Sequence, residues 1–287
     1  MIVPGLRRRI VLLVCIVASM SAPFIGWTRS HAADASAWVG NSRSALRLIA
    51  GTPASGQGFL RAGIEIRLAP GWKTYWRYPG DSGIAARFDF ARSTNVKSVE
   101  VAWPAPHAWR DDAGTSIGYK DNVLLPLRVV PQNPMQPVGL ALAFDYAICE
   151  RVCVPESGST ELQLSASAPE HDAALAAAEA RVPKQSVVGA STGLAIRAVK
   201  RDGTWPHPRI MVDVAAPAGQ SVDLFAEGPT PDWALPLPEP AGEARDGIHR
   251  FTFDIDGVPP GVDPKGATLR LTAVAGADAV EASYRLD

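Results

Sequence analysis

The sequence has few cysteines and lacks a long apolar run outside its N-terminus. The only cysteines are Cys15, Cys149 and Cys153. An apolar run starts at Ile10, and no later segment approaches the roughly 20 apolar residues that cross a bilayer as a helix. A nucleophile elbow, a phosphate-binding loop and an HExxH sequence are also missing. Their absence argues against a conventional hydrolase, a nucleotide-dependent enzyme and a zinc protease.

A strong excess of one charge is missing as well. The chain has 28 basic and 29 acidic residues. Residues 1–32 hold four arginines and no acids, so the remainder has 24 basic and 29 acidic residues and a net charge of −5. This balance argues against nucleic acid as a partner, because such binding depends on neutralising phosphates. It also leaves no strong field toward an anionic membrane surface.

The N-terminus has the layout of a secretory signal peptide. Three arginines at residues 7–9 precede the apolar run, and Ser-His-Ala at residues 30–32 is a small-x-small cleavage site. Two serines and a proline interrupt the apolar run, which favours cleavage over an uncleaved anchor. We therefore expect a signal peptide over residues 1–32 and an exported chain without a membrane span after cleavage. Exported chains can hold disulfides, because their compartment is oxidising.

Most of the remaining sequence alternates apolar and polar residues with a period of two. In residues 59–70, Ile64, Ile66 and Leu68 would share one face of a strand, with charged residues on the other. Gly, Pro, Asn and Asp clusters separate such segments at the spacing typical of a β-sandwich. Strands are predicted over residues 59–70, 96–104, 122–130, 138–149, 159–167, 194–203, 208–217, 221–228, 249–258, 267–276 and 279–287.

One segment has a different period. Residues 169–182 are rich in alanine, with acids early, an arginine late and Pro183 directly after, which predicts a helix. The chain is therefore expected to be all-β, with a first β domain over residues 35–168, a helical linker over 169–185 and a second β-sandwich-like domain over 186–287. A long proline-rich connection is expected in the second domain, at residues 228–247.

Cys149 and Cys153 form the one possible cysteine pair after cleavage, and their spacing leaves three interpretations open. As a structural disulfide the pair would contribute little, because closing a five-residue ring is worth about 2 kcal/mol, against nearly 5 for a hundred-residue loop. Reactive pairs are usually close in sequence, because a nearby thiol resolves a mixed disulfide quickly. Redox exchange is therefore favoured, and a structural disulfide and a metal site remain alternatives.

The metal alternative would use the two sulfurs as soft ligands for Cu(I). Only Met135 and Met211 would remain as methionine ligands, and neither is near the pair in sequence. Zinc would want four ligands, and no second Cys or His pair completes the set. No cofactor is expected. A further alternative is a β-sandwich binding module whose disulfide is purely structural.

Several motifs together resemble the N-terminal periplasmic domain of the thiol:disulfide interchange protein DsbD and its copper-tolerance branch, ScsB. They are GWKTYWRYPGDSG at residues 71–83, WPAP at 103–106, GYKDNVLLPL at 118–127 and YAICERVCVPE at 146–156. Their order and spacing resemble the family over roughly residues 40–168. The similarity of the remaining residues is weaker.

The resemblance implies an immunoglobulin-like β-sandwich with the cysteine pair at one end. It implies that Cys153 forms the mixed disulfide and Cys149 resolves it, and that Tyr75, Tyr146 and Trp109 line the site. Residues 109–116 would correspond to a loop that shields the pair. If active, the chain would be of the protein-disulfide reductase type in the periplasm, passing electrons from a membrane-embedded thiol reductase to thioredoxin-like and other oxidised proteins. The family is also linked to cytochrome c biogenesis and copper tolerance.

The sequence departs from this pattern in three respects. Some relatives separate the cysteines by five residues, whereas three lie between them here. The expected shielding loop reads RDDAGTS and lacks an aromatic at its tip. Full-length relatives continue into membrane helices and a thioredoxin-like domain, so this chain would take electrons from a separate protein. Near the pair, Arg151 would lower the pKa of a thiol, while Asp145, Glu150 and Glu156 would oppose this.

Overall fold

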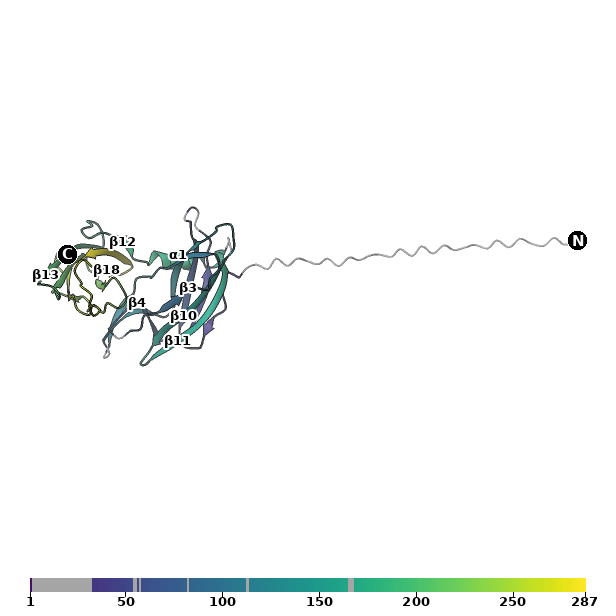
Figure 1. Cartoon of the computed structure of the whole chain (residues 1–287), viewed down its shortest axis with the longest axis horizontal. Coiled ribbons are helices and arrows are strands. Elements are labelled where there is room, and N and C mark those ends of the chain that lie inside the picture. Colours follow the sequence, from purple (N-terminus) through teal and green to yellow (C-terminus); the bar gives the residue numbers. More distant parts are fainter. Residues whose placement is uncertain (2–32, 54–55, 57, 82, 112–113, 165–167) are drawn as a thin grey trace. The chain divides into compact units, whose positions relative to one another are not determined.

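A computed structural model describes Met1 and residues 33–53, 56, 58–81, 83–111, 114–164 and 168–287 (Figure 1). The expected signal peptide, apart from Met1, lies outside the described residues. The described part of the chain is nearly all β, arranged in four sheets with one α-helix. No helix in this part is long and apolar enough to span a membrane.

The first two sheets form an immunoglobulin-like β-sandwich, here called the first sandwich. One sheet has the order β1–β2–β3–β9–β6, and the other has the order β11–β10–β4–β8–β7 with β5 paired to β10. The strands are β1 (Val39–Gly40), β2 (Ser44–Ala50), β3 (Leu60–Leu68), β4 (Lys73–Gly80), β5 (Arg87–Asp89), β6 (Val96–Val101), β7 (His107–Asp111), β8 (Gly114–Lys120), β9 (Val123–Pro131), β10 (Val138–Cys149) and β11 (Cys153–Leu164).

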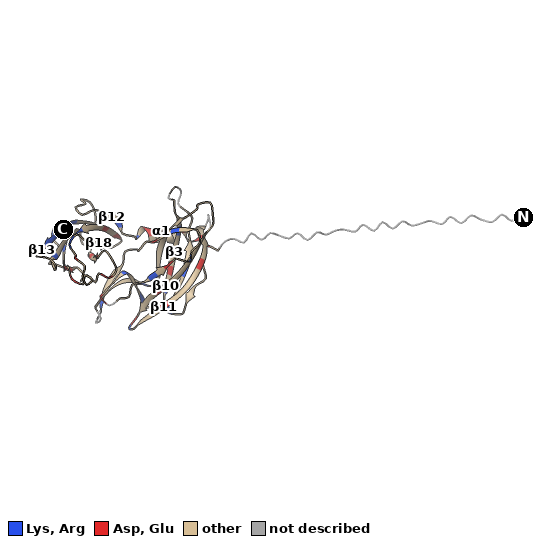
Figure 2. Ribbon diagram, viewed as in Figure 1, with Lys and Arg blue, Asp and Glu red and all other residues tan. Residues whose placement is uncertain are grey.

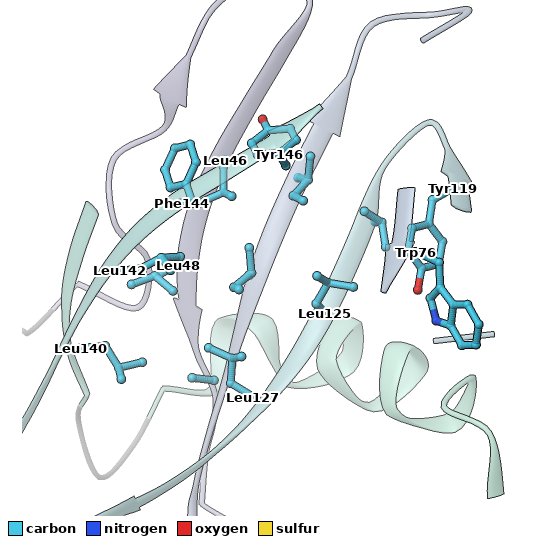
Figure 3. Packing of buried hydrophobic residues seen from close by; sticks show 14 of the residues in the cluster. Leu46, Leu48, Trp76, Tyr119, Leu125, Leu127, Leu140, Leu142, Phe144 and Tyr146 are labelled. Atoms are coloured by element: carbon cyan, nitrogen blue, oxygen red, sulfur yellow. The ribbon is translucent and has the colours of Figure 1, made fainter. Parts of the chain in front are cut away.

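The core of the first sandwich comes from the inward-facing residues of both sheets. In β10, every second side chain from Leu140 to Ile148 is buried, while Ala141, Ala143 and Asp145 on the other face are more exposed. This is the period-two burial that packs one face of a strand against an opposing sheet. Figure 3 shows the residues that meet between the sheets, among them Leu46, Leu48, Leu125, Leu127, Leu140, Leu142, Phe144 and Tyr146.

A short helical segment follows the first sandwich. It consists of a 3-10 turn (Pro169–His171) and α1 (Asp172–Ala180). Arg61 of β3 holds this segment through ion pairs to Asp172 at 3.1 Å and Glu179 at 2.9 Å. Leu175 of α1 is fully buried against Gly63, where an added Cβ would lie 3.0 Å from its Cδ2. Apolar packing and ion pairs therefore both hold the helix against the first sandwich.

The remaining strands form two further sheets around their own core, here called the second sandwich. The sheets have the orders β12–β19–β18–β15 and β13–β14–β17–β16. The strands are β12 (Lys184–Ser186), β13 (Ala195–Asp202), β14 (Arg209–Ala215), β15 (Asp223–Glu227), β16 (Glu239–Pro240), β17 (Ile248–Asp254), β18 (Thr268–Ala275) and β19 (Asp278–Arg285). Residues from both sheets share one apolar cluster, which includes Val212, Phe251 and Leu271.

The expected all-β class, with an immunoglobulin-like first sandwich, is confirmed. The structure adds elements that the sequence did not predict, including β2, β4, β7 and β8. It also places β12 in a sheet beside β19, directly after the helix. The domain bounds at residues 168 and 185 stay a prediction, because Phe225, Val274 and Ala279 of the second sandwich pack into the core cluster of the first.

Charges of both signs are interspersed along the strands of both sandwiches (Figure 2). Several form ion pairs across neighbouring strands, such as Arg209 with Asp254 at 2.8 Å and Arg250 with Asp213 at 2.6 Å. Exposed pairs of this kind contribute little to stability, typically about 0–1 kcal/mol. Their positions therefore carry less information about function than the buried polar groups described below.

Candidate functional site

The cysteine pair lies at the turn between β10 and β11. Cys149 is the last residue of β10, Cys153 is the first residue of β11, and the two are direct cross-strand partners. Their Cα atoms lie 4.2 Å apart, and the two sulfurs are joined in a disulfide. The register of the whole hairpin, from Val138 opposite Leu164 onward, brings the cysteines together. The disulfide therefore closes the end of a long antiparallel hairpin.

The two cysteines differ in how far they are exposed to solvent. Cys149 is 3% exposed, whereas Cys153 is an exposed residue. The turn between them is also open to solvent, with Val152 72% exposed. An incoming thiolate must approach a sulfur along the S–S axis, so the exposed sulfur is the accessible target. The disulfide is therefore asymmetric, because it joins one exposed and one buried cysteine.

Tyr75 of β4 contacts both sulfurs. Its hydroxyl group donates a hydrogen bond to Cys149 Sγ at 2.8 Å and lies 3.2 Å from Cys153 Sγ. The ring is 3% exposed and packs with Ala147 and Cys149 in a small cluster separate from the sandwich core. Gly83 closes over this ring, because an added Cβ there would lie 2.7 Å from Tyr75 Cδ1.

The pairing of β4 with its neighbours explains why Tyr75 reaches the sulfurs. On one side, Thr74 pairs with Ile148 and donates a side-chain hydrogen bond to the Ala147 carbonyl at 2.9 Å. On the other side, Tyr75 pairs with Gly118 of β8. A Cβ on Gly118 would lie 2.0 Å from the Thr74 carbonyl oxygen, so only glycine permits this close approach.

Lys73 places a positively charged side chain on the same face of the sheet as Cys149. It lies directly opposite Cys149 across the β4–β10 pairing, and the residue is only 9% exposed. Paired residues in a sheet point to the same face, so the side chains of Lys73 and Cys149 share the outer face. The Nζ of Lys73 lies 5.2 Å from the ring centroid of Trp109, and the Nζ of Lys120 lies at the same distance.

Trp109 lies near Lys73, which in turn lies opposite Cys149 of the disulfide. Its ring contacts two ammonium groups, an arrangement favoured by the negative face of an indole. Its Nε1 atom is buried without a hydrogen-bond partner among the described residues. The expected shielding segment, residues 109–116, is mostly a strand pair here, with Trp109 opposite Ser116. Residues 112–113 at its tip lie outside the described residues, so shielding stays a prediction.

Tyr146 lies on the opposite face of β10 from Cys149. It packs in the core of the first sandwich, and its hydroxyl shares a 2.5 Å hydrogen bond with Ser44 of β2 (Figure 3). Burial raises the pKa of Tyr146, with Ser44 opposing the shift. Its expected role as a lining residue stays a prediction, and the contacts above place the tyrosine hydroxyl of Tyr75 at the sulfurs.

The charged residues flanking the pair have other contacts. Glu156 accepts two hydrogen bonds from Asn41, both at 2.9 Å, and lies 3.8 Å from Arg43. Arg151 and Glu150 are exposed at the turn. Among the described residues, no group of three or more His, Cys, Asp and Glu side chains is arranged to hold a metal ion.

Sequence reasoning missed Lys73, Gly83 and Gly118 as parts of this site. The signal for Lys73 was present, because it shares the parity of Tyr75 in an alternating Lys-Thr-Tyr-Trp segment. The glycines carry no comparable signal, since their role depends on which strands become neighbours. Close backbone approach between β4 and β8 is visible only once the sheet order is known.

Comparisons with known proteins found a matching family and a similar fold. Residues 47–165 match the family described as thiol:disulfide interchange protein DsbD, N-terminal. The fold is similar to the crystal structure of the N-terminal periplasmic domain of ScsB from Proteus mirabilis, with a TM-score of 0.68 and 21% sequence identity, over 88% of this chain and 98% of that one. No curated protein matches the chain. Residues 47–165 are therefore similar to the N-terminal domain of the DsbD family, the fold is similar to that of the ScsB domain, and this segment carries the Cys149–Cys153 disulfide.

Proposed function

We propose that the protein is a periplasmic thiol:disulfide interchange protein that passes electrons through Cys149 and Cys153. The observation that carries this proposal is the asymmetric disulfide. Cys153 is exposed, whereas Cys149 is buried and accepts a hydrogen bond from the hydroxyl of Tyr75. A purely structural disulfide needs no such asymmetry. A redox pair needs one sulfur that a partner reaches and one that is kept for the second step.

Reduction of the protein begins at the exposed sulfur. A thiolate of the electron donor attacks Cys153 Sγ, a new S–S bond forms, and the Cys149–Cys153 bond breaks. The bonding pair leaves with Cys149 as a thiolate. The second thiolate of the donor then attacks the first donor sulfur, which is bonded to Cys153 in the mixed disulfide. This attack releases Cys153 as a thiolate. The donor ends oxidised, and this protein has gained two electrons and, after protonation, two thiols.

Electron delivery reverses these roles. The Cys153 thiolate attacks a disulfide of an oxidised partner and forms a mixed disulfide, releasing one partner thiolate. Cys149 then attacks Cys153 Sγ, the intermolecular bond breaks, and the second partner sulfur leaves as a thiolate. The intramolecular disulfide is restored, and the partner is reduced by two electrons. Cys149 never has to leave its buried position in this sequence of steps.

Tyr75 assists both directions by hydrogen bonding to Cys149. A buried thiolate is disfavoured by the loss of its hydration. The hydroxyl at 2.8 Å already points at this sulfur, so it needs no reorganisation when charge develops there. Tyr75 would therefore stabilise Cys149 as the leaving group during reduction and as the attacking group during delivery.

The proposed partners follow from the family resemblance. A membrane-embedded thiol reductase would donate the electrons, and thioredoxin-like or other oxidised periplasmic proteins would accept them. The motif order over residues 71–156 and the family match support this placement. The signal-peptide layout of residues 1–32 supports export to the periplasm.

Two measurements on the chain without residues 1–32 test the proposal. Redox equilibration followed by alkylation should give a reduction potential well above about −300 mV, the upper bound typical of structural disulfides. A Cys149→Ser variant should accumulate a mixed disulfide with a thioredoxin-like protein, and a Cys153→Ser variant should not. A potential below that bound, without trapping, would make the pair structural. A reduced pair protected from alkylation by Cu(I) would instead support the copper-binding alternative.

A further inference from the structure

Strand β4 carries Tyr75 but is incompletely held by its own sheet. It pairs with β10 only at Lys73 and Thr74. Its ladder with β8 covers Lys73 to Tyr75, is interrupted, and resumes at Gly80. The segment directly after Tyr75 thus lacks the regular backbone pairing that fixes a central strand. Something else must hold this segment in place.

Residues of the second sandwich contact this interrupted segment. The guanidinium of Arg77 donates three hydrogen bonds to the carboxylate of Glu227, from Nε at 2.9 and 3.2 Å and from Nη2 at 2.7 Å, and it also pairs with Glu281. Bidentate Arg–carboxylate pairs fix orientation as well as distance. The hydroxyl of Tyr78 donates to the carbonyl of Leu235 in the proline-rich connection.

Apolar contacts reinforce these polar ones. Trp76 is fully buried, and its ring centroid lies 5.6 Å from that of Phe225 in β15. The Arg77 guanidinium stacks on Trp76, with its Cζ 4.2 Å from the ring centroid. Aromatic pairs at this distance and Arg–Trp stacking are both attractive. Trp76, Arg77 and Tyr78, the three residues that follow Tyr75, therefore all contact the second sandwich or stack on a residue that does.

One of these acceptors, Glu281, has further partners within the second sandwich. Glu281 accepts a hydrogen bond from Gln185 of β12 at 2.9 Å and lies 3.6 Å from Arg270 of β18. Burial alone would raise the pKa of Glu281, but Arg77, Gln185 and Arg270 outweigh it and hold the pKa below its ordinary value. Glu281 is thus a carboxylate kept charged within a partly buried network, suited to binding Arg77 in one geometry.

From these contacts we propose that the second sandwich braces β4 and thereby sets the position of the Tyr75 hydroxyl at the disulfide, with Arg77 as the positioning residue. The inference rests on the proposed exchange function and gives the second sandwich a part in it. Tyr75 and Arg77 are two residues apart on one strand, so a shift of the braced segment moves the Tyr75 ring. A hydrogen bond weakens steeply with distance and angle, so a small shift is enough to lose it.

The test uses Arg77→Lys, which keeps the charge but loses the bidentate fork, and Glu227→Gln as a milder second variant. Arg250→Lys is the matched control, because Arg250 forms a similar two-bond pair with Asp213 inside the second sandwich. Reduction of the disulfide by dithiothreitol should slow about threefold in Arg77→Lys, as expected when a hydrogen bond to a partly charged leaving group is weakened. The control should react at the rate of the unmodified protein.

A double variant separates bracing of Tyr75 from a general loss of structure. If Arg77 acts through Tyr75, adding Arg77→Lys to Tyr75→Phe should slow the reduction no further. Additive slowing in the double variant, or an unchanged rate in both Arg77→Lys and Glu227→Gln, would overturn the inference while leaving the exchange function intact.

A second readout does not depend on exchange. The pKa of the Cys149 thiol, measured by ultraviolet absorbance in a Cys153→Ser background, should rise when Arg77→Lys or Glu227→Gln is added and stay constant with Arg250→Lys. Should the unmodified protein fail to exchange with any thiol partner, the proposed function fails, and this titration still decides the inference. A constant pKa in the two brace variants would refute it.

Discussion

Replacing Tyr75 by phenylalanine removes one hydroxyl group from the disulfide and leaves the ring in place. The lost interactions are the hydrogen bond to Cys149 Sγ at 2.8 Å and the contact with Cys153 Sγ at 3.2 Å. The ring would still pack against Ala147 and beneath Gly83. The substitution therefore tests the hydroxyl alone, with little expected change in packing.

The magnitude follows from the charge on the sulfur. A hydrogen bond to a charged group contributes about 1.5–3 kcal/mol. For a full thiolate on Cys149, this loss would raise the pKa of the thiol by about one to two units. When an incoming thiolate attacks Cys153, the charge on the leaving sulfur is about half developed, so about 0.7–1.5 kcal/mol is lost. The reduction should therefore slow about three- to tenfold.

The assay is reduction of the oxidised protein by dithiothreitol under pseudo-first-order conditions, with timed alkylation and mass measurement. Tyr146→Phe is the matched control, because it removes a tyrosine hydroxyl from the opposite face of the same hairpin, where it bonds to Ser44. The control should lose about 1 kcal/mol of unfolding free energy and keep the exchange rate. Tyr75→Phe with an unchanged rate and an unchanged Cys149 pKa would refute the role assigned to this hydroxyl.

Three other substitutions probe the neighbourhood of the site and the helix. Lys73→Met removes a positive charge opposite Cys149, so the pKa of the Cys149 thiol should rise by about half a unit or more. The pH dependence of alkylation measures this pKa, and Lys73→Arg should largely preserve it. Gly118→Ala places a Cβ 2.0 Å from the Thr74 carbonyl oxygen, so urea unfolding should show a loss of about 1–3 kcal/mol and exchange should slow. Hydrogen bonding from Thr52, helped by the charge of Arg61, lowers the pKa of Asp172; a lowered carboxyl pKa stabilises the fold above the unfolded pKa, near 3.9. Asp172→Asn should therefore cost stability at pH 7, and this difference should vanish as the pH falls through the folded pKa, whereas a constant difference down to pH 2 would contradict the assignment.

The sequence was sufficient to predict elements with strong alternation. Residues 138–149 form a strand with the predicted bounds, and the predicted helix over residues 169–182 appears as a 3-10 turn followed by α1. The motifs around the cysteines were enough to identify the family resemblance that the comparison supports. These features are local, because period, caps and turns depend on neighbours in the sequence.

The alternation in residues 138–149 also predicts on which face of the strand Tyr146 lies, whereas the family resemblance implied that Tyr146 lines the site. Tyr146 shares its parity with Phe144 and Ile148, the apolar and inward-facing set of β10, whereas Cys149 shares its parity with Ala147. Period two alone therefore places Tyr146 on the face away from the sulfurs. Strand β4 was harder to predict, because its consecutive aromatic residues pack on both faces of the strand. Tyr75 packs at the disulfide, and its neighbour Trp76 packs in the core.

The contacts that hold β4 could not be predicted from the sequence. Arg77 lies 150 residues from Glu227 and 204 from Glu281. Nothing in an arginine between two aromatics indicates which distant carboxylate it will meet. Such pairings depend on how whole sheets pack, which involves long-range contacts without a local signature.

The burial of Cys149 has two opposing consequences, and the site accommodates both. In the proposed exchange, burial would protect Cys149 from direct attack and direct a partner to the exposed Cys153. The same burial disfavours the thiolate that must leave when Cys153 is attacked. The hydroxyl of Tyr75 and the ammonium of Lys73 are both placed on the face of the sheet where that charge develops. Selectivity for Cys153 and a competent leaving group at Cys149 therefore depend on the same strand, which explains why the position of β4 matters more to the chemistry than any residue in the exposed turn.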